Sequence, residues 1–382
     1  MTSVEIAGIG LHSFGRFDGV TVTDMGVAAV RQALAEAEVG RGGFQAAFCG
    51  TAYGGVATGH KVLGALGMTG MPIVDVEAGC ASGAAALMLG RAAIDAGQYD
   101  TVVVFGVEKM PRGIIRSSFF DPWQEEAGFA ATPAYFALRA QRFMMSSGVT
   151  KDHLAAVVVK NRRHGMHNPD AMYRSEVTAE AVLSSRVVSE PLHLWMLCSP
   201  NEGAAAVVLR RADTSGAAAE GRVELAAAVL RSHLPGAVLS ESTPMAGLID
   251  DTLPTPSTLA ATDAYEQAGL GPRDLDVVEC QDTDAARELM SYEELGLCAA
   301  GGAAEMLEAG ATSIGGRLPV NPSGGLLSKG EPLGASALGQ VVEVVRQLRG
   351  QAGPRQVHGA RVGLTHTVGR GANAGVVLLR RT

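Results

Sequence analysis

Residues 77–83 of the chain (EAGCASG) follow a short apolar run, 72–76, and open a stretch rich in alanine, residues 80–96. This pattern predicts a strand, a tight turn and a helix that begins at Cys80. A cysteine at a helix N-terminus faces backbone N–H groups without helical partners and the positive end of the helix dipole, and both lower the pKa of its thiol. Cys80 is therefore a candidate nucleophile. The alternative is that it is a small buried packing residue, as most free cysteines are.

Short apolar runs alternate with helical patterns on both sides of this turn. In the first half, strands are expected at 4–9, 45–49, 72–76 and 101–107, and helices at 23–37 and 80–96. In the second half, strands are expected at 203–209, 223–230, 277–280, 361–367 and 374–379, and helices at 258–268, 292–297 and within 326–348. Runs that are apolar on both faces and separated by helices are typical of a buried, mostly parallel sheet.

The two halves look like one unit used twice. Each contains a turn with glycine that leads into a helix of small residues, at 78–83 and at 321–336, and two such turns facing each other would form one site. We predict four parts: an N-terminal half (1–111), an inserted loop or cap domain (112–195), a return strand (196–215) and a C-terminal half (216–382). Within this scheme, residues 213–219 form a linker.

Composition narrows the classes of function. The chain has 382 residues, 47% hydrophobic and 18% charged, which is enough for a large buried core. A net charge of −8 and only 5% aromatic residues argue against nucleic-acid binding. Five cysteines without a CxxC pair favour neither a disulfide framework nor a metal site, as expected in a reducing cytoplasm. No signal peptide and no apolar run of about 20 residues is found, so we expect a soluble protein without a membrane partner.

Several segments, in the same order along the chain, resemble the thiolase superfamily. The nucleophile motif of that family is similar to EAGCASG. Further similar segments are 8–17 (GIGLHSFGRF), 107–110 (VEKM), 160–164 (KNRRH), 199–209 (SPNEGAAAVVL), 321–336 (NPSGGLLSKGEPLGAS) and 363–376. The resemblance is strongest to the branch of lipid-transfer and sterol-carrier thiolases.

This resemblance implies an α/β thiolase fold, with two similar βαβαβαββ halves forming a five-layer αβαβα sandwich. It also implies a homodimer and coenzyme A thioester substrates, with no tightly bound cofactor and no metal. Cys80 would accept the acyl group. The backbone N–H groups of Cys80 and Gly369 would form the oxyanion hole for the tetrahedral intermediate.

The chain departs from the family at three active-site positions. The histidine of the family's GHP motif is replaced by Glu331, and the NEAF or HDAF motif by residues 281–284 (QDTD). Where classical thiolases carry a second cysteine, this chain has Thr367, preceded by His366.

The replacing residues are still able to support catalysis. Glu331 would take the thiol proton, and Gln281 would donate its amide N–H to the oxyanion. His366 would act as general acid or base, because its unperturbed pKa lies near working pH. The alternatives are structural: Glu331 caps a helix that starts at Pro332, and the other two are satisfied polar residues.

Three further residues are candidates for substrate binding: Asp282, Ser336 and Arg163. Arg163 belongs to a basic stretch, 160–167 (KNRRHGMH), which suits the phosphates of coenzyme A. The favoured alternative is that this stretch is an exposed helix face. The remaining cysteines are expected to be packing residues: Cys49, Cys198, Cys280 and Cys298.

Together these features predict a thiolase-like acyltransferase of lipid metabolism. Cys80 would take an acyl group from an acyl-CoA or acyl-carrier donor and transfer it in C–C bond formation or cleavage, or in acylation. One alternative is a lyase that performs a retro-aldol cleavage of a coenzyme A thioester. The other is a catalytically impaired thioester-binding subunit that works with a small OB-fold/zinc-ribbon partner protein.

Overall fold

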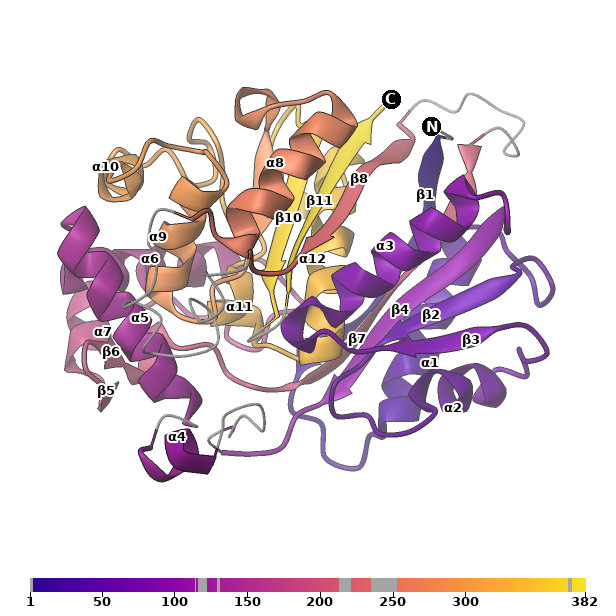
Figure 1. Ribbon diagram of the computed structural model, residues 1–382, viewed down its shortest axis with the longest axis horizontal. Coiled ribbons are helices and arrows are strands. Elements are labelled where there is room, and N and C mark those ends of the chain that lie inside the picture. The colour runs from indigo at the N-terminus through magenta and orange to yellow at the C-terminus, as the bar shows by residue number, and fades with distance from the viewer. Residues whose placement is uncertain are drawn as a thin grey trace.

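Two units with the same strand order make up the fold (Figure 1). The computed structural model describes residues 3–113, 115, 122–128, 131–212, 221–234, 253–369 and 373–382. The predicted linker, 213–219, lies outside the described residues. Both chain termini lie at the same end of the molecule (Figure 1).

The strands of both halves follow one topology. The first half contains β1 (Val4–Gly15), β2 (Ala46–Gly50), β3 (Ile73–Val76), β4 (Thr101–Lys109) and β7 (Glu202–Arg211), in the order β3-β2-β4-β7-β1. The second half contains β8 (Val223–Arg231), β9 (Val277–Cys280), β10 (Val362–Val368) and β11 (Ala374–Arg381), in the order β9-β10-β11-β8. Beside β9, the bridge between Val278 and Val320 stands where β3 stands in the first half. The predicted repeat is thus confirmed, with its third strand reduced to one bridge.

Helices cover the sheets and fill the space between them. The first half has α1 (Val22–Glu36), α2 (Thr58–Ala65) and α3 (Ser82–Asp95). The inserted segment has α4 (Pro122–Glu126), α5 (Thr132–Ser147), α6 (Lys151–Gly165) and α7 (Ala179–Ser184), with the short strands β5 (Val187–Ser189) and β6 (Leu192–His193). The second half has α8 (Pro256–Ala268), α9 (Ala285–Glu294), α10 (Ala303–Glu308), α11 (Gly325–Lys329) and α12 (Leu333–Leu348).

Three large apolar cores separate these elements into five layers. The strands of the two halves join through β1 and β8 into one nine-stranded sheet. An outer core joins α1 and α2 to the strands of the first half, and a central core joins α3 and α12 to the strands of both halves. A third core joins α8 and α9 to the strands of the second half and to the inserted helices. Neighbouring residues of β11 point into different cores: Val377 into the central core and Leu378 into the third one. The predicted αβαβα sandwich is confirmed, and most strand residues are buried and apolar because helices cover both faces. The prediction of a mostly parallel sheet was wrong: β2 is parallel to β3 and β4, and β9 to β10, whereas the pairs β1–β7, β4–β7, β1–β8, β8–β11 and β10–β11 are antiparallel.

The two central helices meet the strands through glycine. A Cβ atom added at Gly106 would lie 2.1 Å from the carbonyl oxygen of Gly334, and one added at Gly334 would lie 2.5 Å from that of Gly50. At Gly83 the added atom would be 3.1 Å from the Gly334 oxygen. This close approach brings the first turns of α3 and α12 together, so the segments that precede these helices meet at one place.

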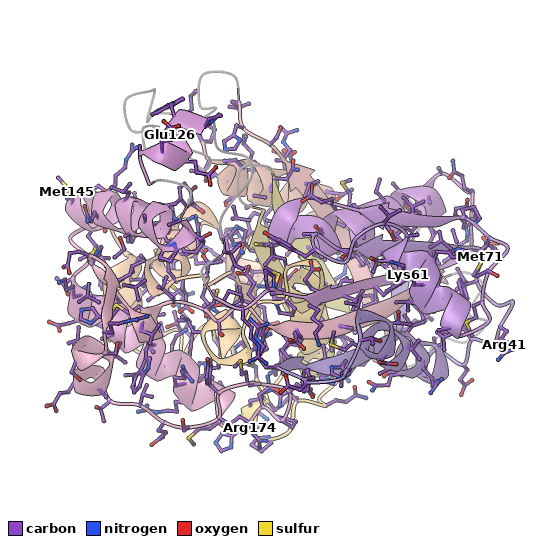
Figure 2. The ribbon with its side chains drawn as sticks, turned by 90° about the horizontal axis from the view of Figure 1, so that it is seen from below. Arg41, Lys61, Met71, Glu126, Met145 and Arg174 are labelled. Atoms are coloured by element: carbon purple, nitrogen blue, oxygen red, sulfur yellow. The ribbon has the colours of Figure 1, made fainter. Side chains whose placement is uncertain are left out.

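The inserted helices form a lobe beside α9, α10 and α11 (Figure 1). Figure 2 shows Met145 on α5 at one end of the molecule and Arg41, Lys61 and Met71 at the other. The helix predicted at 292–297 was placed wrongly: α9 begins at Ala285 because Asp284 accepts a hydrogen bond from the backbone N–H of Arg287, at 3.0 Å, as an N-cap. Within the described part of the chain, no helix is both long and apolar enough to cross a membrane.

The contact at Gly334 makes a prediction about stability. Gly334→Ala is expected to lower the free energy of unfolding by about 1–3 kcal/mol, because the added methyl group overlaps the backbone at Gly50. Gly64→Ala is the matched control: it lies in α2 with open space around it, and should raise the free energy of unfolding by at most about 1 kcal/mol. Urea unfolding curves of both variants measure the difference. Equal effects would show that the close contact at Gly334 carries no constraint.

Candidate active site

A cavity of about 850 Å³ opens where α3, α12 and the inserted lobe meet. Its walls come from distant parts of the chain, since the two halves and the lobe all contribute. The lining includes Gly79 and Cys80 from the first half, Gln281, Glu331 and Val368 from the second, and Arg139, Arg162, Trp195 and Cys198 from residues 131–212. Among the described residues, no group of three or more His, Cys, Asp or Glu side chains could hold a metal ion.

The predicted strand, turn and helix around Cys80 are confirmed. β3 ends at Val76, and a short 3₁₀ turn (Gly79–Ala81) leads into α3. Gly79 has φ +58°, a left-handed conformation that glycine adopts without strain. The Ser82 hydroxyl ties the turn together, because it donates to Gly79 O at 2.6 Å and accepts from Ala78 N at 2.9 Å. Cys80 is 7% exposed and lies in the cavity wall.

Glu331 brings a buried carboxylate to the same wall. Its Oε1 accepts from Gln281 Nε2 at 2.9 Å, its Oε2 accepts from Cys198 Sγ at 3.3 Å, and the carboxylate also hydrogen-bonds Cys80. Among the described residues it has no basic partner. Burial raises the pKa of Glu331, while these hydrogen bonds act in the opposite direction. The helix-cap interpretation is not supported, because no side chain caps α12, which begins after Pro332.

Cys198 was missed by the sequence analysis, which treated it as a packing residue. It lines the cavity, and burial together with the charge of Glu331 raises the pKa of its thiol, so Cys198 acts as a hydrogen-bond donor. The backbone holds it in place, because Glu331 N donates to Ser199 O at 2.9 Å. The only signal in the sequence was its position directly before the segment 199–209.

Gln281 is at the cavity, but its amide is already engaged. Its Nε2 donates to Glu331, and its Oε1 accepts from the backbone N–H of Val368. Gln281 therefore orients the Glu331 carboxylate with one N–H of its amide, while donation of the second N–H to an oxyanion stays a prediction.

His366 and Gly369 are not among the residues that line the cavity. His366 is fully buried, with Nε2 2.9 Å from Ser257 Oγ, and burial, aided by the charge of Arg287, moves its pKa well below the usual value. Its ring is therefore neutral and lies behind the cavity wall rather than in it. The Gly369 N–H, expected in the oxyanion hole, donates to Asn373 O at 2.6 Å.

The three predicted substrate-binding residues also lie outside the cavity wall. Asp282 is buried and holds the start of α11, accepting from Leu326 N at 2.6 Å. Ser336 bonds within its own helix, with Oγ 3.2 Å from Leu333 O. The side chain of Arg163 is 68% exposed and points to solvent.

The exposed-face interpretation of residues 160–167 is wrong for most of the stretch. α6 packs against α9 and α11, so Lys160, Arg162 and His164 are buried. Lys160 Nζ pairs with Glu288 Oε1 at 2.6 Å. Arg162, the neighbour of the predicted Arg163, is the residue of this stretch that lines the cavity.

Family models match both halves of the chain. A model for the thiolase N-terminal domain matches residues 4–213, and one described as thiolase C-terminal domain-like matches residues 240–381. Among curated proteins, the chain is 36% identical to an acetyl-CoA acetyltransferase of Methanothermobacter thermautotrophicus, over 100% of both chains. It is 36% identical to the benzoylsuccinyl-CoA thiolase subunit BbsB of Thauera aromatica, covering 97% of this chain and 96% of the relative. It is 34% identical to sterol carrier protein 2 of Oryctolagus cuniculus, covering 99% of this chain and 72% of the relative.

Solved structures show the same fold. The structure titled "Ltp2-ChsH2(DUF35) aldolase" superposes with a TM-score of 0.87 at 24% identity, covering 99% of this chain and 98% of the other. The Acat5 thiolase from Ascaris suum in complex with coenzyme A superposes with a TM-score of 0.72 at 17% identity, over 100% of both chains.

Proposed function

Since the chain belongs to the thiolase family, we propose that it is an acyltransferase in which Cys80 takes an acyl group from an acyl-coenzyme A. The observation that carries the proposal is the hydrogen bond between Cys80 and the buried carboxylate of Glu331 in the wall of an 850 Å³ cavity. A thiol beside a base is the arrangement that nucleophilic catalysis needs. The names of two relatives, an acetyl-CoA acetyltransferase and a benzoylsuccinyl-CoA thiolase subunit, support a coenzyme A thioester as donor.

The first half-reaction loads the enzyme. The Glu331 carboxylate accepts the thiol proton while the sulfur of Cys80 attacks the thioester carbonyl carbon. The tetrahedral intermediate then collapses, the bond to the sulfur of coenzyme A breaks, and the leaving thiolate takes the proton from Glu331. Backbone N–H groups at the start of the α3 turn, that of Cys80 included, are the proposed oxyanion donors.

The second half-reaction uses the same carboxylate again. Glu331 removes a proton from the α-carbon of a second thioester, and the resulting enolate attacks the acyl carbon on Cys80. The carbon–sulfur bond breaks, and the Cys80 thiolate recovers the proton from Glu331. A pKa raised by burial makes Glu331 a stronger base for this step than a solvated carboxylate. Gln281 and Cys198 are positioning residues, because each holds one oxygen of Glu331.

Acyl loading tests the proposal directly. After incubation with a panel of acyl-coenzyme A thioesters, intact-protein mass spectrometry should show an acyl adduct on the wild type and none on Cys80→Ala. Cys298→Ala removes a thiol outside the cavity wall and should keep the adduct. An adduct that persists in Cys80→Ala would refute the assignment of the nucleophile.

The lyase alternative predicts a different outcome of the same experiment. A retro-aldol cleavage needs a base and a thioester pocket, which Glu331 and the cavity supply, but no covalent cysteine. If no thioester loads and cleavage of a β-hydroxyacyl thioester survives in Cys80→Ala, the lyase function replaces the transferase.

The pH dependence of loading tests the role of Glu331. The base is active as the carboxylate, so the loading rate should rise with pH through a pKa above the usual value for glutamic acid, about 4.3. Glu331→Gln keeps the size of the side chain but is no base. It should slow loading by about 100-fold or more and remove this rise. Rapid-quench loading between pH 4.5 and 8 measures both effects, and an unchanged profile in the variant would exclude Glu331 as the base.

A homodimer is also part of the proposal. β3 is an edge strand, paired only with β2 among the described strands, and Val74 on it is 42% exposed. Such an edge offers a row of free backbone groups to a second copy of the chain. The name of the Thauera relative, a subunit, supports a further partner chain, for which the resemblance suggests an OB-fold/zinc-ribbon protein.

The edge strand gives a prediction about assembly. Val74→Lys puts a charge on the exposed face of β3 and should convert a dimer into a monomer, as measured by light scattering after size exclusion. Met145→Lys is the control, since Met145 is 88% exposed on α5, at the other end of the molecule (Figure 2). Dissociation by Met145→Lys alone would place the contact on the inserted lobe.

A further inference from the structure

Arg162 is a buried cation in the cavity wall. It lies on α6, is 7% exposed, and its guanidinium carbon lies 4.1 Å from the centre of the Tyr173 ring. Its Nε is buried and has no hydrogen-bond partner. Within the described part of the chain, its side chain makes no ion pair and no hydrogen bond.

Two other arginines of the cavity wall have acidic partners. The partly buried Arg139 pairs with Asp284 at 2.8 Å, and the buried Arg287 pairs with Glu294. Burial of a charge without a partner is costly, and burial lowers the pKa of Arg162. A guanidinium nevertheless stays protonated in proteins, so it cannot escape this cost by losing its proton. An anion that enters the cavity would give this buried, unpaired guanidinium its missing partner.

Arg162 lines the same cavity as the reacting groups. The start of the segment that carries Glu331's partner is tied to α6, because Asn161 donates to Asp282 Oδ2 at 2.8 Å and Gln281, directly before Asp282, holds Glu331. In coenzyme A the phosphates are separated from the thioester sulfur by the whole pantetheine arm. An anion that reaches Arg162 while the thioester lies at Cys80 therefore belongs to the acyl group.

We propose that Arg162 binds a carboxylate on the acyl group, so that the substrates are thioesters of dicarboxylic acids. This inference rests on the proposed function, because it places the thioester at Cys80. The planar guanidinium matches a carboxylate through two parallel hydrogen bonds, and the stack on Tyr173 fixes its plane. A neutral acyl chain leaves the charge without a partner, so the site selects against it.

Binding to a protein that cannot load tests the inference apart from catalysis. In a Cys80→Ala background, calorimetry should show that Arg162→Gln lowers the affinity for succinyl-coenzyme A by about 10- to 100-fold, since a hydrogen-bonded charge pair is lost. The affinity for butyryl-coenzyme A, which has a chain of similar length without the carboxylate, should change by less than about threefold. Arg162→Lys keeps the charge and should restore part of the affinity. Arg163→Gln is the matched control, since Arg163 lies on the same helix but is exposed, and it should change neither of the two affinities.

Other results would overturn the inference. If Arg162→Gln weakens both thioesters equally, and has no effect on the corresponding pantetheine thioesters, Arg162 binds a phosphate of coenzyme A. If it weakens neither, the cavity has no anion site at Arg162. Circular dichroism checks that the variants fold. If Arg162→Gln does not fold, the affinities of Arg162→Lys for the two thioesters are compared with those of the parent protein instead. A preserved preference for succinyl-coenzyme A in a protein that never forms a Cys80 adduct would reject the acyl transfer and keep the anion site.

Discussion

The site depends on the buried carboxylate of Glu108, at the end of β4. It accepts hydrogen bonds from Ala52 N at 2.8 Å, Tyr53 N at 3.0 Å and Gly334 N at 3.1 Å. The first two lie in the loop after β2, and the third in the first turn of α12. One carboxylate thus fixes the start of the second central helix against the first sheet. Because Glu331 precedes that helix by two residues and the Cys80 turn contacts it, the distance between thiol and base follows from this anchor.

A second buried network fixes the segment before α11 against the inserted lobe. Glu288 accepts from Asn161 and Asn321, each at 2.6 Å, and pairs with Lys160. These contacts join α6, α9 and the segment before α11. Buried polar groups satisfied in this way specify one arrangement, since breaking any member leaves a buried group without a partner. The inserted lobe is therefore held rigidly against the second half, and the wall that carries Arg162 keeps its place relative to Glu331.

The strands, the helices and the turn at Cys80 were predicted because they depend on local patterns, whereas the five-layer sandwich was predicted from the resemblance to the thiolase superfamily. The role of Cys80 as nucleophile stays a prediction. The apolar runs and the small residues after Cys80 each determine an element without help from distant residues. Of the partners of that cysteine, Glu331 was predicted from the resemblance and Cys198 was not, because Cys198 and Glu331 meet only through pairing between distant segments. Similarly, a basic stretch does not show which residue faces the cavity: Arg162 and Arg163 are adjacent, yet helical geometry turns them about 100° apart. His366 has the environment of the structural alternative, a satisfied polar residue, because it lies in a strand covered on both faces and its Nε2 lies 2.9 Å from Ser257 Oγ.

Within the described part of the chain, two charged side chains in the cavity wall, Glu331 and Arg162, lack partners of opposite charge, and we infer that substrate groups supply them. Glu331 has no basic partner and Arg162 no acidic one among the described residues, yet both line one cavity. If stability alone were at stake, the two would pair with each other, or apolar side chains would replace them, since isolated buried charges are destabilising. Their separation is useful if each acts on a different part of one ligand. The carboxylate accepts and returns the proton of the reacting sulfur and α-carbon. The guanidinium binds the far end of the acyl chain. A ligand with an anionic end would then satisfy Arg162 on binding, while Glu331 stays a base because no cation neutralises it.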